Sequence, residues 1–205
     1  MTTTRTLTRR AGLAAVAVTS ALVLAACGDG GGHTGHRSVA GSSATPGSSA
    51  GAHNAQDVAF AQGMVPHHRQ ALEMARLAAG RASSAQVKDL AARIEKAQDP
   101  EIRTMTGWLT AWGEQVPMAG MDHSGHSGMS GMMSDADMTA LKKATGKDFD
   151  TRFLSLMVRH HQGAVEMAAT EKDKGRSGAA KAVADDIVTA QNAEIKEMRQ
   201  LLGTS

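Results

Sequence analysis

Two His-His pairs, each flanked by methionines, are the residues of this chain best suited to chemistry. The pairs are identical in spacing and lie 93 residues apart (67 and 160). Residues three and four apart on a helix share a face, so each Met-x-x-His-His run brings thioether and imidazole groups together. Thioether sulfur favours Cu(I) and by extension Ag(I), whereas imidazole accepts Cu(I), Cu(II) and Zn(II). The two copies contain Met64, His67, His68 and Met74, and Met157, His160, His161 and Met167.

The repeat extends beyond these pairs with no gap. The matched residues further along are Asp57 and Asp150, Phe60 and Phe153, Gln98-x-x-Glu101-Ile102-x-x-Met105 and Gln191-x-x-Glu194-Ile195-x-x-Met198. A repeat of this length indicates one structural unit made twice, here a helix with the His-His pair followed by a second helix. We therefore expect Met105 to lie opposite the first pair and Met198 opposite the second.

Apolar periodicity and capping residues predict four principal helices. The expected ranges are 57–79 with Asp57 as N-cap and Gly80 as terminator, Ser83 or Ser84 to Gly113, 148–175 and 177–202, with a short helix over 135–143. Pro66 predicts a kink or restart just before His67, and Pro100 predicts a bend in the second helix. Two helical hairpins joined by a long crossover predict an all-α, ferritin-like four-helix bundle.

Metal ligation has a plain alternative at every candidate. Methionine at helical spacing usually fills a core, and a histidine beside an apolar face is usually a satisfied core residue. The conjunction of both residue types, present twice, favours ligation. Glu101 and Glu194 are expected to form hydrogen bonds within the bundle or to orient a histidine, with direct ligation as the alternative.

A low-complexity loop over residues 118–133 joins the two halves. Gly/Ser-rich segments are commonly plain linkers, but a linker needs neither methionine nor histidine, so we expect a metal-capture segment. Its candidate ligands are Met118, Met121, His123, His126, Met129, Met132 and Met133. His33 and His36, further upstream, form a weaker echo of the same pattern.

The first residues have the composition of a targeting segment. Residues 1–26 combine a basic start with a short apolar run and are predicted to be a signal peptide. Leu24-Ala25-Ala26-Cys27 is similar to a bacterial lipobox, which implies lipidation of Cys27, and Arg9-Arg10 leaves open Sec or twin-arginine export. Residues 27–53 are Gly/Ser-rich and predicted to be a flexible tether, leaving 54–205 as the folded domain. The expected location is the outer face of a bacterial cytoplasmic membrane.

Charge and cysteine content exclude several classes of protein. Cys27 is the only cysteine, so neither a disulfide nor a thiolate cluster can form within one chain. The formal net charge is +2, but loss of residues 1–26 would remove three arginines and leave 19 basic against 20 acidic residues. No basic footprint for nucleic acid remains. The expected partners are metal ions and, through Cys27, the membrane; dimerisation and the identity of a copper-accepting protein are left open.

The doubled motif Met-x-x-His-His-x-x-Ala-x-x-Met-Ala, each copy followed by Gln-x-x-Glu-Ile-x-x-Met, resembles a known family. It is similar to the ferritin-like domain of unknown function numbered three hundred and five, whose characterised members include CopM-type copper-binding proteins. The resemblance implies a helical bundle that binds copper or silver through the ten motif residues. Pro66, and Gly163 where the first copy has Gln70, break the symmetry, so the two sites are expected to differ in affinity.

The prediction is an extracytoplasmic, lipid-anchored copper-binding protein acting in sequestration, resistance or delivery. Cu(I) is favoured, with Cu(II) or Ag(I) as alternatives. A structural or interaction bundle is the first competing hypothesis, and it leaves the Met/His loop unexplained. A ferritin-like di-metal oxidase is the second, but such centres use Glu-x-x-His, and Arg76 and Ala169 occupy the histidine positions after Glu73 and Glu166. We therefore expect no enzymatic activity.

Overall fold

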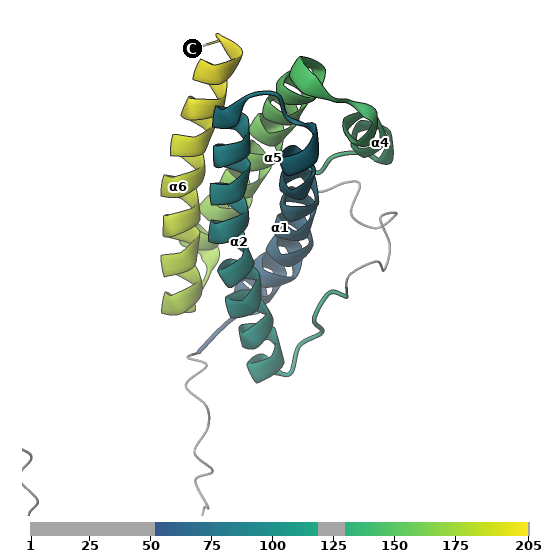
Figure 1. Cartoon of the computed structure of the whole chain (residues 1–205). Helices are drawn as coiled ribbons and strands as arrows, with labels where there is room; N and C mark the ends of the chain where they lie inside the picture. Colours follow the sequence, from purple (N-terminus) through teal and green to yellow (C-terminus); the bar gives the residue numbers. More distant parts are fainter. Residues whose placement is uncertain (1–51, 119–129, 205) are drawn as a thin grey trace, which may run out of the picture. The chain divides into compact units, whose positions relative to one another are not determined.

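A computed structural model describes residues 52–118 and 130–204, all within the second of the two units into which the chain divides, 44–205. Within that part of the chain all regular structure is helical (Figure 1). The predicted signal peptide, Cys27, all but the last two residues of the predicted tether and most of the Met/His loop lie outside the described residues. The helices are α1 (Ala55–Arg81), α2 (Ala85–Trp112), α4 (Asp135–Lys143), α5 (Gly146–Lys174) and α6 (Gly178–Leu202).

The molecule is a ferritin-like four-helix bundle made of two repeated hairpins. Helix α1 pairs with α2 and α5 pairs with α6, while α1 and α5 pack together between the hairpins. The predicted N-cap Ser84 and the predicted C-terminal glycines Gly113 and Gly203 are confirmed, because both glycines adopt positive φ. Ser177 caps α6, and the short helix α4 has the predicted bounds.

Three local predictions are wrong. Asp57 is not the N-cap of α1: Asn54 is, and Asp57 completes a capping box from the third helical position. Helix α1 continues through Gly80 to Arg81, since tertiary packing outweighs the modest helix penalty of one glycine. The third is the restart predicted as one outcome of Pro66, because α1 runs unbroken through this residue. A kink at Pro66, and a bend at Pro100 in the equally continuous α2, stay predictions.

Two buried aspartates clamp one hairpin to the other. Asp57 on α1 accepts the backbone N–H groups of Arg176 and Ser177, with Ser177 at 2.8 Å. Its repeat partner Asp150 on α5 accepts the N–H groups of Ser83 (3.1 Å) and Ser84 (3.0 Å) and the Ser83 hydroxyl. Each carboxylate therefore lies at the N-terminus of the second helix of the other hairpin, where the helix dipole favours negative charge. The two contacts obey the same twofold relation as the sequence repeat.

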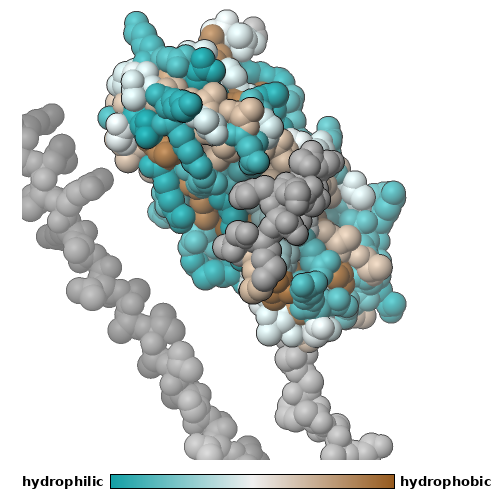
Figure 2. All heavy atoms as spheres, turned by 90° about the vertical axis from the view of Figure 1, so that its right-hand side faces the viewer, coloured by the Kyte–Doolittle hydropathy of each residue, from teal (hydrophilic) through white to brown (hydrophobic). Residues whose placement is uncertain are grey.

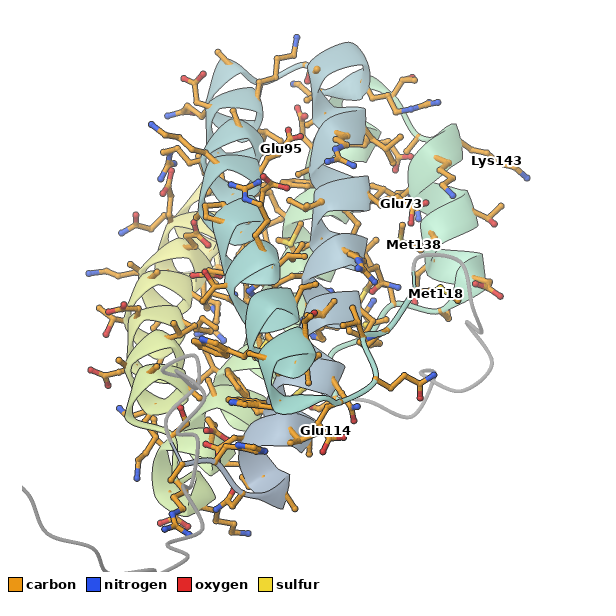
Figure 3. All side chains as sticks on the ribbon, turned by 90° about the horizontal axis from the view of Figure 1, so that it is seen from below. Glu73, Glu95, Glu114, Met118, Met138 and Lys143 are labelled. Carbon is orange, nitrogen blue, oxygen red and sulfur yellow. The ribbon has the colours of Figure 1, made fainter. Side chains whose placement is uncertain are left out.

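Helix α4 covers the outer side of the α1–α5 pair. Met138 and Leu141 are buried beneath it, and Lys142 Nζ lies 2.6 Å from Glu73 Oε1 on α1. Figure 3 shows Glu73 extending from α1 on the side where Met138 lies. The molecular face on this side is mostly hydrophilic with small hydrophobic patches (Figure 2). Among the described helices, none is long and apolar enough to cross a membrane.

Candidate metal centre

The buried core consists of two hydrophobic clusters related by the repeat. We name them after the equivalent residues Phe60 and Phe153. The Phe60 cluster contains Phe60, Ala61, Met64, Val65, Met105, Leu109, Ala164, Ala168, Ala184 and Ile187. The Phe153 cluster includes Ala71, Met74, Val87, Leu90, Ala91, Ile94, Phe149, Phe153, Met157, Ile195 and Met198.

A layer of buried polar side chains separates the two clusters along every helix. Reading along α2, for example, Ile94 belongs to the Phe153 cluster, Gln98 is polar and buried, and Met105 belongs to the Phe60 cluster. The same succession, in one direction or the other, occurs on α1, α5 and α6. The polar layer consists of His67, His68, Gln98, His160, His161 and Gln191, all at most 3 % exposed, with Glu101 and Glu194 at its edge.

His67 and His160 lie at the centre of the polar layer. Their ring centroids are 3.7 Å apart with an interplanar angle of 37°. Because these residues are equivalent in the two repeats, their contact places the pseudo-twofold axis between the two rings. Neither nitrogen of either ring has a hydrogen-bond partner among the described residues.

Burial keeps these two histidines neutral. It lowers the pKa of His67 to about 3, and the neighbouring His68 and His161 act in the same direction. The backbone of Ser130 faces the His67 ring and opposes this lowering, although it does not reach hydrogen-bond geometry. Burial also lowers the pKa of His160 well below its ordinary value, aided by His67, His161 and His68. Neutral imidazole is the form that binds metal ions.

The outer histidines are each held by a carboxylate. His68 Nε2 lies 2.7 Å from Glu101 Oε2, and His161 Nε2 lies 2.7 Å from Glu194 Oε2. Since an ionised carboxylate only accepts, each Nε2 donates in this pairing, and Nδ1 is the nitrogen with a lone pair for a metal ion when the ring is neutral. Both Nδ1 atoms are buried without a partner within the described part of the chain. The prediction that these glutamates form hydrogen bonds within the bundle is confirmed, and direct ligation by them stays the untested alternative.

The motif methionines divide between the clusters across the pseudo-twofold axis. Met64 and Met105 lie in the Phe60 cluster with Met167 packed against it, while Met157, Met198 and Met74 occupy the equivalent positions of the Phe153 cluster. Met64 and Met157 are one turn from a layer histidine. Met74 lies seven residues beyond His67, about 10.5 Å along the helix axis. Met74 and Met167 therefore lie outside the polar layer.

The described methionines of the 118–133 loop differ in their exposure to solvent. Met118 is 60 % exposed, as a capture residue would be, and Met132 is half-buried. Met133, expected in the exposed loop, is instead buried in the Phe153 cluster because Gln70 holds its backbone N–H and C=O. Met121, His123, His126 and Met129 lie outside the described residues.

The sequence analysis missed the role of two glutamines. Gln98 and Gln191 were assigned to the motif but not to the site, yet they complete the polar layer with unpaired amide atoms. The available signal was their recurrence at the 93-residue offset one turn before Glu101 and Glu194. In the described ranges, no three His, Cys, Asp or Glu side chains are grouped to hold one metal ion. Methionine thioethers are therefore candidate additional ligands for the layer imidazoles.

Residues 57–202 match the family described as domain of unknown function DUF305. The chain belongs to this family. A DUF305 protein from Streptomyces coelicolor is 34% identical, with a TM-score of 0.64 over 72% of this chain and 91% of that one. A DUF305 fragment from Deinococcus radiodurans is also 34% identical, with a TM-score of 0.66 over 74% and 98%.

The DUF305 chain is also similar to CopM. Cu(II)-bound CopM is 36% identical, with a TM-score of 0.63 over 72% of this chain and 95% of that one. CopM has further been solved in Cu(I)-bound and silver-bound forms. No curated protein matches the chain.

Proposed function

We propose that this DUF305 protein binds soft metal ions in the polar layer of its bundle, with Cu(I) as the preferred ion and Ag(I) and Cu(II) as alternatives. The observation that carries the proposal is a set of buried imidazole nitrogens of the four layer histidines that have no partner among the described residues and are bordered by methionines. Buried polar atoms without partners are rare in folded proteins and call for an explanation such as an unseen ligand. Imidazole with thioether suits copper and silver.

The proposed ligands fall into two equivalent sets. His67, His68, Met64 and Met105 form the set on the Phe60 side, and His160, His161, Met157 and Met198 form the set on the Phe153 side. Glu101 and Glu194 leave the Nδ1 lone pairs of the outer histidines free to bind. Such supporting contacts typically contribute about 10- to 100-fold to metal affinity. Met74 and Met167 would act as packing neighbours or as secondary acceptors.

The similarity to CopM supports copper and silver as cargo, since CopM binds these ions in its solved forms. The predicted signal peptide and lipobox support an extracytoplasmic, membrane-anchored protein that sequesters copper, confers resistance or delivers the ion. Apart from Met133, which is buried in the Phe153 cluster, the methionines and histidines of the 118–133 loop are proposed to capture metal ahead of the bundle.

An anaerobic Cu(I) competition titration tests the proposal. The full chain should carry Cys27→Ser, which removes its only thiol. Alanine at all four layer histidines should weaken binding at least about tenfold, the lower range for lost metal-site contacts. A second variant, lacking residues 119–129, should lose capture sites but retain the tightest binding. If only the second variant loses tight binding, the loop and not the polar layer is the principal metal-binding site.

Two alternatives make different predictions in the same titration. A structural bundle would bind neither copper nor silver, whether or not the four layer histidines are present. A di-metal oxidase would prefer iron or manganese held by carboxylates. In the described residues the two glutamates of the layer are each already paired with a histidine, which favours the binding protein.

A further inference from the structure

Residues 130–133, which we term the strap, lie directly against the outside of the polar layer. Ser130 faces the His67 ring through its backbone, and its hydroxyl donates to Glu166 Oε2 at 2.5 Å. Gly131 lies beside the backbone carbonyls of Arg159 and His160. The strap thus spans from α5 to the central histidine of α1.

Two residues that are equivalent in the two repeats hold the strap in place. On α1, Gln70 accepts the N–H of Met133 at 2.8 Å and donates to its carbonyl at 3.0 Å. On α5, the equivalent Gly163 allows backbone contact: a Cβ there would lie 2.1 Å from the Ser130 carbonyl oxygen and 2.7 Å from Gly131 Cα. Gly131 itself has φ of 80°, a conformation that favours glycine.

This geometry explains a break in the repeat that the bundle alone does not require. Gln70 and Gly163 lie three residues after His67 and His160, so each is one turn from the central pair. Gln70 provides hydrogen bonds to the strap, and Gly163 provides the space in which the strap backbone lies. Together they hold four residues of backbone across the pseudo-twofold axis, where His67 and His160 are 0 % and 1 % exposed.

We propose that the strap controls exchange of the bound ion by closing the outer side of the His67–His160 pair, with Gln70 and Gly163 as its positioning residues. The inference rests on the proposed function, because it concerns the kinetics of that site. The strap contains none of the proposed bundle ligands. Displacing it should therefore change exchange rates more than equilibrium affinity.

The test compares Cu(I) release from the loaded full chain, carrying Cys27→Ser, to a chromophoric chelator under stopped flow. Gly163→Ala should accelerate release because the added Cβ displaces Ser130 and Gly131. Gln70→Ala should do the same by removing both bonds to Met133, by about tenfold for two such hydrogen bonds. Gly80→Ala is the matched control: it also replaces a helix glycine, but nothing lies within 4 Å of its Cβ.

Hydrogen exchange at the Met133 amide provides a second readout, independent of metal. It should be protected in the parent chain and unprotected in Gln70→Ala. Gln70→Ala adds no atoms, so it decides the test alone if Gly163→Ala does not fold. Copper binding with equal release rates in all variants would overturn the strap and leave the proposed function standing. Absence of copper binding in the parent chain would overturn both.

Discussion

At the scale of single residues, Glu171 is the buried acid that departs from the internal symmetry. It is 0 % exposed, and its counterpart in the first repeat is Ala78. Burial, and then the neighbouring Asp57, raise the pKa of Glu171 from 4.5 to about 8. Burial acts to raise the pKa of Asp57 too, but the neighbouring Glu171 and the backbone amides that Asp57 accepts outweigh it and lower that pKa. Of the two acids, Glu171 is therefore the one that stays protonated to higher pH.

This pKa has a defined effect on stability. A folded-state pKa above the unfolded value stabilises the protein below pH 4.5, and that contribution is lost as pH rises toward 8. Glu171→Gln keeps a donor for Asp57 and does not titrate. We expect the melting temperature of the variant to rise relative to the parent between pH 4.5 and 8. The buried histidines titrate in both chains, so subtracting the two melting temperatures removes their contribution.

Thermal melts of both chains at half-unit pH steps measure this effect. Glu95→Ala, which removes an exposed carboxylate paired with Arg76, is the control and should show a constant difference from the parent. A pH-independent difference for Glu171→Gln would mean that Glu171 is ionised in the folded protein.

At the scale of elements, the reciprocal aspartate clamps fix how the hairpins face each other. Asp57 and Asp150 each bind the start of the other hairpin's second helix. This arrangement aligns α1 and α5 so that equivalent residues meet, and it places His67 against His160. The aspartate contacts at the ends of the bundle thus determine which residues meet in its middle.

Removing one clamp should therefore destabilise the fold. Asp150→Ala leaves the N–H groups of Ser83 and Ser84 without their acceptor, at an expected cost of about 1–2 kcal/mol. Urea unfolding followed by circular dichroism measures the change. The control is Asp148→Ala, whose exposed pair with Arg152 should contribute less than about 1 kcal/mol. Equal stability of both variants would show that the clamp is not needed.

Helix positions were predictable because they depend on local signals. Ser84, Ser177, Gly113 and Gly203 end or begin helices by capping chemistry that involves only a few neighbours. The restart that Pro66 was expected to cause does not occur, since α1 is continuous through this residue. Asp57 was misassigned because its main partners lie in residues 176 and 177, far along the chain.

At the scale of the whole molecule, the candidate ligands were predictable as types but not as an arrangement. The repeat showed that His67 and His160 are equivalent, yet their contact follows from antiparallel packing of two hairpins. The same packing assigns Met167 to the cluster of Met64, and Met74 to that of Met157. Met133 could not be separated from the loop by composition, because its burial depends on Gln70.

The central claim is that sulfur and imidazole from the bundle together bind the metal ion. X-ray absorption at the copper edge tests it most directly, on the Cu(I)-loaded full chain with Cys27→Ser and without residues 119–129. We predict a shell containing both sulfur and imidazole nitrogen. Leucine at Met64, Met105, Met157 and Met198, a nearly volume-conserving change, should remove sulfur and leave the helical fold intact. A shell without sulfur in the parent, or one unchanged by the four leucines, would contradict the account.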